Sequence, residues 1–288
     1  MILIADAGAT KTDWALVRGD GSISLRFKTG GINIAVTDAE IADSIIAEAT
    51  EQISCPDRVK QVFFYGAGIV GDSSASDLAG RLALSFPCAA IECNSDLLAA
   101  ARALFGNGDG VVAIMGTGSN ACEYRNGRIV RTIASGGYIL GDEGGANALG
   151  RRFLADYIKG LAPEDLCSGM DLPDYPALVG ELYHGGSPAR YLASFAKVLL
   201  TEHAEHPYVK GLVSECVEAF VSRALSRFDC KDIAVVGSFG VLCRDAITAA
   251  GERYGLSFVK FMQAPMDALV DFHSMSFRDG SIPGKIGI

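Results

Sequence analysis

The apolar positions of the chain fall into short runs separated by glycine-rich turns, and the same succession of runs occurs twice. Residues 2–21 give a short apolar strand, a glycine turn, a second strand and a tight polar turn. Residues 111–127 repeat this punctuation, and the Asn-Gly pair at their end is a strong hairpin signal. Each hairpin continues through a third strand to a double glycine, at residues 30–31 and 136–137, and then into a helical pattern. A repeated unit constrains the fold more strongly than any single motif does.

The two halves continue in parallel. Residues 62–66 and 233–237 are buried-type strands that run into glycine turns and then into amphipathic helices. A further strand follows each helix, at residues 89–93 and 257–261. Hairpin, third strand, helix, strand, helix, strand and helix, executed twice, is the layout of the duplicated actin-like, or ribonuclease-H-like, α/β fold. We therefore predict two domains that flank a nucleotide cleft.

The domain boundary is predicted in residues 106–110, a run that is too rich in glycine to continue a helix. The N-terminal domain is then residues 1–108, and the C-terminal domain is residues 109–266 with helical insertions at about 186–228. After Pro265 we expect a helix, about residues 267–288, that crosses back to the N-terminal domain.

Composition narrows the function. A chain of 288 residues that is 49% hydrophobic and 20% charged can bury one large core or two modest ones. Its net charge of -9 leaves no broad basic surface, so we expect no nucleic-acid partner. The apolar runs are too short to span a bilayer, and the N-terminus has no positively charged region of a signal peptide. We therefore expect a cytoplasmic protein without a membrane partner, and the apolar surplus is compatible with a homodimer.

Cysteine and histidine give no strong metal signal. The eight cysteines are spread along the chain without a paired spacing that would suggest zinc. We interpret most of them as reduced core residues. His203 and His206 could share a metal on a helix face, but the polar end of a helix before Pro207 is the simpler interpretation.

Two glycine turns at equivalent positions of the repeat have the composition of phosphate loops. Glycine lets backbone N–H groups approach phosphate oxygens, and both residues 6–12 and residues 116–120 also offer hydroxyls. Asp6, at the end of the first strand, is placed to hold magnesium through water. An ordinary hairpin turn would explain either loop alone, but it does not explain both at equivalent positions.

Asp96 follows a buried strand and precedes residues 97–104, which are strongly helical. One interpretation is a capping aspartate that stabilises the helix by about 1 kcal/mol. The other is a general base, because catalytic groups reach a crevice from the carboxyl ends of strands in α/β sheets.

Several segments resemble one family. Residues 6–12, Asp-Ala-Gly-Ala-Thr-Lys-Thr, are similar to the first phosphate loop of the N-acetylglucosamine kinase and BadF-BadG-BcrA-BcrD ATPase family, where Asp-Gly-Gly-Gly-Thr-Lys-Thr is usual. Residues 116–119 resemble its second phosphate loop. Residues 136–145, Gly-Gly-Tyr-Ile-Leu-Gly-Asp-Glu-Gly-Gly, resemble its specific Gly-Trp-Gly-x-x-Leu-Gly-Asp-Glu-Gly-Ser signature. Residues 236–240 stand where the family keeps an adenosine-contacting Gly-Gly turn, and the resemblance covers essentially the whole chain.

The resemblance implies an enzyme that uses ATP and Mg²⁺ to phosphorylate an amino sugar, with N-acetylglucosamine and its 6-phosphate as first choice. N-acetylmuramic acid and glucosamine are the alternative acceptors. Asp96 corresponds to the base that takes the proton from the sugar hydroxyl. The positions implied for the sugar are Asn33, Asp96, Thr117, Asn120, Gly137 and Asp142. The positions implied for the nucleotide are Asp6, which also holds the metal, Gly8, Thr10, Lys11, Thr12, Gly116, Thr117, Gly118, Gly237, Ser238 and Gly240.

The chain departs from the family pattern at four positions. Ala7, Ala9 and Ser238 replace glycines, and Tyr138 stands where Trp is common. The side chains that replace these glycines add bulk near the phosphates or the base, so these three positions bear on the affinity for the nucleotide.

The sequence also suggests three other interpretations. Residues 66–71 match GxGxxG after a strand, with Glu92 about 20 residues further on, as in a Rossmann fingerprint. That interpretation explains neither the duplication nor the Gly-Asp-Glu-Gly segment. An activator ATPase that drives electron transfer through an iron-sulfur cluster needs clustered thiolates, and the nearest cysteines in sequence are Cys88 and Cys93. A sugar-sensing regulator would need a DNA-binding module, and the chain has no basic helix-turn-helix extension.

Overall fold

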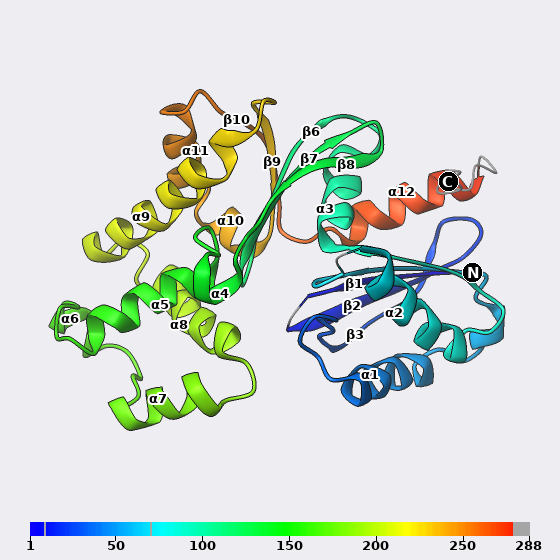
Figure 1. The fold of residues 1–288 in the computed structure, drawn as a ribbon, viewed down its shortest axis with the longest axis horizontal. Helices are drawn as coiled ribbons and strands as arrows, with labels where there is room; N and C mark the ends of the chain where they lie inside the picture. The colour runs from blue at the N-terminus through cyan, green and yellow to red at the C-terminus, as the bar shows by residue number, and fades with distance from the viewer. Residues whose placement is uncertain (9, 70, 279–288) are drawn as a thin grey trace. The chain divides into compact units, whose positions relative to one another are not determined.

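The computed structural model describes residues 1–8, 10–69 and 71–278. The chain divides into two compact units (Figure 1). Unit 1 comprises Met1–Asn107 together with the segment that begins at Pro265, and unit 2 comprises Gly108–Ala264. The change from one unit to the other thus lies one residue before the boundary expected between residues 108 and 109.

Unit 1 is built on a mixed five-stranded sheet in the order β3-β2-β1-β4-β5. The strands are β1 (Ile2–Ala7), β2 (Lys11–Val17), β3 (Ile23–Gly30), β4 (Gln61–Gly66) and β5 (Ala90–Ser95). β1 is antiparallel to β2 and parallel to β4, and β4 is parallel to β5. The three strands of the predicted hairpin unit are therefore followed by two parallel strands that need crossover helices.

Helices cover both faces of this sheet (Figure 1). They are α1 (Ala39–Glu51), the short 3-10 helix η1 (Pro56–Arg58), α2 (Gly71–Ser85), α3 (Asp96–Phe105) and α12 (Met266–Arg278). Leu3, Val62 and Phe64 share a buried core with Ile46 of α1 and Leu78 of α2. Because side chains alternate along a strand, the neighbouring residues project to the opposite face, where α3 and α12 contact the strands.

Unit 2 repeats this plan. Its sheet has the order β10-β9-β6-β7-β8, which matches the order in unit 1 when it is read in the opposite direction. The strands are β6 (Gly110–Met115), β7 (Ser119–Arg125), β8 (Arg128–Ile133), β9 (Asp232–Val236) and β10 (Ser257–Met262). The β6-β7-β8 meander corresponds to β1-β2-β3, and the parallel strands β9 and β10 correspond to β4 and β5. The predicted duplication and the α/β fold class are confirmed.

Unit 2 carries more helices than the repeat requires. They are α4 (Gly137–Leu140), α5 (Ala146–Tyr157), α6 (Glu164–Cys167), α7 (Tyr175–His184), α8 (Pro188–Glu202), α9 (Pro207–Arg223), the 3-10 helix η2 (Leu225–Arg227), α10 (Ser238–Leu242) and α11 (Arg244–Glu252). α8 and α9 occupy the predicted insertion, whereas α6 and α7 were not predicted. α5 packs closely on α8, since a Cβ on Gly150 would lie 1.9 Å from the carbonyl oxygen of Leu192.

The histidine pair ends one helix and begins the next. α8 ends before His203, and the ring of His206 accepts a hydrogen bond from the N–H of Tyr208 at the start of α9. The interpretation as polar helix ends is therefore confirmed.

The cysteines of the described residues are all free, but Cys122, Cys216 and Cys243 are the three that are fully buried. Cys93, Cys167 and Cys230 are half-buried and pack against the two cores, so six of the eight cysteines lie in or against a core, and the expectation that most of them are core residues is confirmed. No helix in the described ranges has the length and apolar character needed to cross a bilayer.

Candidate active site

The turn between β1 and β2 is a tight hairpin with charged side chains at its base. The N–H of Gly8 donates to the carbonyl oxygen of Lys11 at 2.9 Å, which closes the turn. The ammonium group of Lys11 lies 2.7 Å from the carboxylate of Asp13 and is half exposed. Thr12 is fully buried, and its hydroxyl donates to the carbonyl oxygen of Gly30 at 2.9 Å. Lys11 is therefore available to a ligand in a way that the Thr12 side chain is not.

Asp6 is surrounded by carboxylates. It pairs with Asp13 in the antiparallel register of β1 and β2. Burial, and then the charges of Asp13 and Asp96, raise the pKa of Asp6 to about 7, and Lys11 only partly offsets this. Asp6 therefore needs a nearby cation to remain ionised, and otherwise it binds a proton near neutral pH.

This environment fits a magnesium ion held largely by water and phosphate oxygens. Within the described ranges, no group of three His, Cys, Asp or Glu side chains lies close enough to chelate a metal directly. Magnesium usually keeps several waters and takes one or two carboxylates from the protein. The carboxylate neighbours of Asp6 favour a cation there, and the assignment of Asp6 to the metal stays a prediction.

Asp96 is the first residue of α3, but it is not the cap of the helix. The Ser95 hydroxyl accepts the hydrogen bond from the Leu98 N–H at 3.3 Å and is the N-cap. Asp96 accepts a hydrogen bond from the N–H of Leu97 at 2.8 Å, and burial raises the pKa of its carboxyl. The interpretation of Asp96 as the capping residue is therefore wrong, and its carboxylate needs another explanation.

In unit 2 the equivalent turn, after β6, is held from within by one buried carboxylate. Asp142 accepts hydrogen bonds from the N–H of Ser119 at 3.1 Å and from the side-chain amide of Asn147 at 2.7 Å. A Cβ on Gly118 would lie 2.6 Å from this carboxylate, so the close approach requires glycine. Asp142 itself has a φ of 56°, which is a rare conformation for a residue with a side chain.

The first turn of α5 also fixes this loop. The N–H groups of Ala146 and Asn147 donate to the carbonyl oxygens of Gly116 and Thr117 at 2.9 and 2.8 Å. Asn147 is 2% exposed and was not identified from the sequence. Its role depends on contacts with residues far away in the chain, and no local pattern indicates it.

The turn after β9 lies against the same loop. Gly237 has a φ of 125°, and a Cβ there would lie 2.2 Å from the carbonyl oxygen of Met115 and 3.1 Å from the amide nitrogen of Gly116. Gly240 is equally close-packed, with a Cβ position 2.4 Å from Val235. Ser238, between them, is exposed at the start of α10. The structure thus brings the predicted nucleotide positions of unit 2 together.

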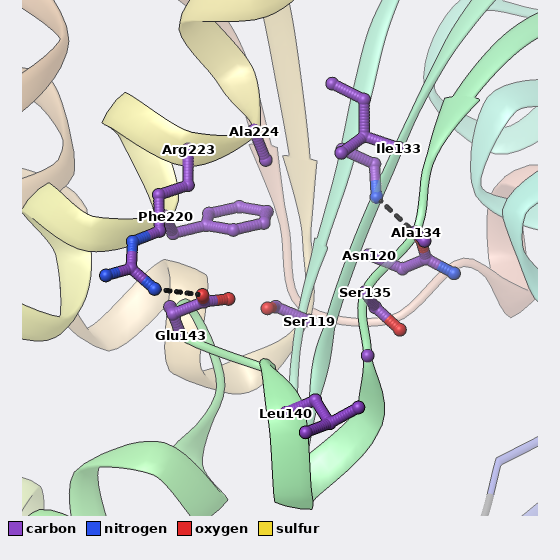
Figure 2. Close-up of a pocket in the computed structure, with 12 residues that line it drawn as sticks. Ser119, Asn120, Ile133, Ala134, Ser135, Leu140, Glu143, Phe220, Arg223 and Ala224 are labelled. Atoms are coloured by element: carbon purple, nitrogen blue, oxygen red, sulfur yellow. Dashed lines mark hydrogen bonds and ion pairs between the residues drawn. The ribbon is translucent and has the colours of Figure 1, made fainter.

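A cavity of about 100 Å³ opens beside this loop (Figure 2). The Phe220 ring projects from α9 toward the strand that carries Ile133 (Figure 2), and Leu140 forms another apolar wall. Ser119 and Asn120, from β7, supply polar atoms. The cavity therefore has a mixed lining, in which apolar walls face polar groups and the Glu143–Arg223 ion pair.

The signature segment, residues 136–145, forms one side of this cavity. Glu143 pairs with Arg223 of α9 at 3.2 Å, as the dashed line in Figure 2 marks. Arg151 donates to the carbonyl oxygens of Ile139 at 3.3 Å and Gly141 at 3.4 Å, and also to that of Tyr138. Gly137 has open space around its Cβ position. The segment is therefore held by side chains from two helices.

Asn33 lies in a separate loop of unit 1. Its side-chain oxygen accepts a hydrogen bond from the N–H of Ala35 at 3.1 Å. A Cβ on Gly68 would lie 2.1 Å from that oxygen. Gly68 thus permits close packing of two loops. Separately, Glu92 forms an ion pair with Arg102 at 2.9 Å. These contacts account for the GxGxxG-like glycine and for the acidic residue after it without a dinucleotide.

The predicted site residues form two groups, one in each unit. Within unit 1 the structure brings together Asp6, Gly8, Lys11 and Asp96, with Asp13 as an unpredicted neighbour. Within unit 2 it brings together Gly116, Thr117, Gly118, Asn120, Asp142, Gly237 and Gly240. Thr10 is half-buried in the first turn, and Ala9 lies outside the described residues.

A duplicated α/β unit with a glycine turn after the first strand of each half is the architecture of ATP-binding proteins of the actin-like fold. The chain belongs to the BadF/BadG/BcrA/BcrD ATPase family, whose model matches residues 5–233. The predicted family is therefore confirmed.

Solved structures agree with this assignment. A proposed N-acetylglucosamine kinase from Porphyromonas gingivalis is 33% identical, with a TM-score of 0.89, and the match covers 96% of this chain and 99% of that one. A proposed N-acetylglucosamine kinase from Chromobacterium violaceum is 19% identical, with a TM-score of 0.67 and coverage of 95% and 98%. A ROK family glucokinase from Streptomyces griseus, solved with glucose and AMPPNP, is 18% identical, with a TM-score of 0.60 and coverage of 95% and 98%. The comparison with curated proteins gives no match.

Proposed function

We propose that this chain transfers the terminal phosphoryl group of ATP to the 6-hydroxyl of an amino sugar, with N-acetylglucosamine as the acceptor. The enzyme class, an ATP-dependent sugar kinase, is supported by the ATPase family model and by the 33% identity to the Porphyromonas gingivalis protein. The particular sugar is our inference from the site.

The observation that carries the proposal is the pair of half-buried carboxylates, Asp6 and Asp96, at two strand ends of unit 1. Phosphoryl transfer needs chiefly positioning, charge neutralisation and a group that accepts the proton of the attacking hydroxyl. Asp96 follows β5 and does not cap its helix, so its carboxylate can accept that proton. Its raised pKa makes it a stronger base than an ordinary aspartate.

Asp6 is suited to a different task. Magnesium, when bound, neutralises charge on the β- and γ-phosphate oxygens. Asp6 would hold this ion through water, and the half-exposed Lys11 offers a positive charge in the same turn. The N–H groups of the glycine turns can donate to phosphate oxygens without obstruction by side chains.

The cavity in unit 2 supports an acylated sugar. A small pocket that offers both apolar and polar groups is suited to a substituent such as an acetamido group, whose methyl needs apolar contact and whose amide needs hydrogen bonds. Phe220, Leu140 and Ile133 offer the apolar contact, and Ser119 and Asn120 offer polar atoms. Glucosamine, which lacks the acetyl group, would leave this space unfilled.

A size change at the cavity wall tests the choice of sugar. Ala224, a half-buried lining residue, would be replaced by Leu, which fills the space that we assign to the acetyl group. We expect kcat/KM for N-acetylglucosamine to fall by at least about 10-fold, the scale of a few misplaced methyl groups in a pocket, with kcat/KM for glucosamine retained. The readout is ADP release in a coupled assay.

Ser214→Leu is the matched control, because Ser214 is exposed on α9 and does not line the cavity. An equal loss for both sugars in Ala224→Leu would contradict the assignment of the pocket. ATP turnover that no sugar stimulates would instead favour the activator-ATPase alternative.

A further inference from the structure

The face of the unit 1 sheet that lies under α3 and α12 carries a buried polar network beside the two candidate carboxylates. In the parallel register, Tyr65 of β4 lies between Asp6 of β1 and Asn94 of β5. Side chains at paired positions of neighbouring strands project to the same face. Tyr65 is therefore directly adjacent to Asp6, and Asn94 precedes Asp96 by two residues.

Arg102, near the end of α3, is the centre of this network. Its guanidinium donates to the Tyr65 hydroxyl at 2.5 Å and to the Glu92 carboxylate at 2.9 Å. It also lies 5.6 Å from the ring centroid of Tyr65 and 5.4 Å from that of Phe272 on α12. Its side chain is 10% exposed. Arg102 thus fastens α3 to two strands and to the C-terminal helix.

His273 of α12 completes the network. Its ring stacks on Phe63 with centroids 3.8 Å apart, and its Nε2 lies 2.7 Å from the Tyr65 hydroxyl. Burial, and then the charge of Arg102, lower the pKa of His273 to about 3, so the ring is neutral. Its Nδ1 is buried without a hydrogen-bond partner among the described residues.

These contacts are a costly way to hold a helix. Apolar side chains of similar volume often stabilise a protein as well as a buried charged network, and a buried nitrogen without a partner is destabilising. A guanidinium that donates from one nitrogen to both Tyr65 and Glu92 and lies against two rings, however, holds the helix in one position more narrowly than apolar packing does. Compared with apolar packing, the network therefore stabilises the protein less but defines the position of α3 more narrowly.

We propose that Arg102 is a positioning residue for Asp96. The two residues are six positions apart on α3, about 9 Å along the axis at 1.5 Å per residue. Glu92, Tyr65 and α12 hold Arg102, and the rigid helix carries that placement to the Asp96 carboxylate at its other end. The inference rests on the proposed function, since it requires Asp96 to be the base. It assigns α12 a part in catalysis, although α12 lies about 170 residues further along the chain.

The first test compares Arg102→Lys and Arg102→Gln with the unchanged protein. Misplacing a base by about 1 Å can cost on the order of 100-fold, so we expect kcat to fall by about 10- to 100-fold in Arg102→Gln, with KM for ATP nearly unchanged. Arg102→Lys keeps the charge but loses the planar group that lies against the Tyr65 and Phe272 rings, so its kcat should be intermediate.

Ile46→Val is the control for a loss of stability alone. Ile46 is buried on α1 at the opposite face of the same sheet and touches no member of the network. Thermal midpoints would be measured for each variant, and kcat would be measured well below them. If Arg102→Gln lowers the midpoint but keeps kcat at the level of Ile46→Val, the network is structural only and the proposal is wrong.

A double-mutant cycle separates this inference from the proposed function. If Arg102 acts through Asp96, Arg102→Gln should cause no further loss of kcat in an Asp96→Asn background. Losses that multiply would show that Arg102 acts elsewhere and would overturn the positioning role while leaving Asp96 as the base. Full turnover in Asp96→Asn alone would overturn the base and the positioning role together.

Discussion

The turns after β1 and β6 occupy equivalent places in the repeat, yet they differ in how charge is distributed. In unit 1, two neighbouring carboxylates raise the pKa of Asp6, and the charge of Lys11 offsets this only in part. In unit 2, the oxygens of Asp142 accept hydrogen bonds from Ser119 and Asn147. The Asp6 carboxylate in the first turn therefore favours binding a cation or a proton. The Asp142 carboxylate at the second turn already has hydrogen-bond donors from its own unit.

This difference shows how a duplicated fold can divide its work. Topology alone determines where a loop emerges from the sheet, and it is nearly the same in both units. The side chains around the loop decide whether it can take part in chemistry or serves as a rigid binding surface. We assign the chemistry to unit 1 and the rigid surface to unit 2, and the following variants test that division.

The largest effect is expected for Asp96→Asn. The change keeps the shape of the side chain but removes the base, so kcat should fall by roughly 10²–10⁴, the usual scale for general-base catalysis. Its thermal midpoint should change little, because Ser95 rather than Asp96 caps α3. Ser95→Ala is the matched variant and should lose about 1 kcal/mol of stability with kcat retained. Near-normal turnover in Asp96→Asn would remove the catalytic assignment.

Asp6→Asn should make stability less dependent on pH. The pKa of Asp6 is about 7 in the folded protein against 3.8 for an ordinary aspartate, so between pH 4 and 7 the folded state holds a proton that the unfolded state has released. The free energy of unfolding therefore falls as pH rises through this window, by up to roughly 4 kcal/mol for about three pKa units. Asn carries no such charge and should remove this loss.

The measurement is the thermal midpoint of both proteins at pH 5 and pH 8 without magnesium. Asp6→Asn should be the more stable protein at pH 8, and the difference should shrink at pH 5. Added magnesium should raise the midpoint of the unchanged protein at pH 8 more than that of the variant. A difference that is the same at both pH values would show that repulsion at Asp6 is not the cause.

Asp142→Ala and Asn33→Ala should differ in stability and in KM for ATP, although both positions were predicted to contact the sugar. Removing the Asp142 carboxylate leaves the Ser119 N–H and the Asn147 amide without their acceptor, at a cost of about 1–3 kcal/mol. The loop that carries Gly118 should loosen, so KM for ATP and KM for the sugar should both rise. Asn33→Ala should raise KM for the sugar alone. An Asp142→Ala protein with normal stability and normal KM for ATP would show that the carboxylate does not hold the loop.

The smallest effects concern helix glycines away from either turn. Gly80 of α2 and Gly211 of α9 are exposed, and a Cβ at either position meets nothing within 4 Å. Each change to Ala should add about 0.5–1 kcal/mol of stability, because Ala loses less conformational entropy in a helix. Gly150→Ala is the opposing case, because its Cβ would clash with Leu192. Equal stability effects for all three, measured by denaturant unfolding, would contradict the packing that the structure shows.

The sequence predicts those features that local patterns encode. The strands, the glycine turns and the return of the chain to the first unit follow from periodicity and from the positions of glycine. The first glycine turn identifies Asp6 as a candidate, and the junction of a strand and a helix identifies Asp96. The sequence leaves open whether Asp96 caps α3, because Ser95 and Asp96 both suit an N-cap. The extended backbone of Ser95 and its bond from Leu98 make Ser95 the cap.

Other features depend on contacts across the fold. Asn147 is an ordinary helix residue in sequence, and its contact with Asp142 becomes visible only once the loop and α5 are folded together. Arg102 and His273 are separated by about 170 residues, so no window of sequence could show that they share a network with Tyr65. Residues that belong to a binding motif can therefore be predicted from the sequence. Residues that hold the motif in position through distant contacts cannot.

The most direct test of the account is to identify the product that this protein forms from ATP, magnesium and N-acetylglucosamine. Phosphorus NMR would follow the γ-phosphate of ATP during turnover, with Asp96→Asn run in parallel. We predict a phosphomonoester on the 6-hydroxyl of the sugar, formed in step with ADP and lost in Asp96→Asn. Release of ATP-derived phosphate as the free ion, at the same rate with and without any sugar, would contradict the account.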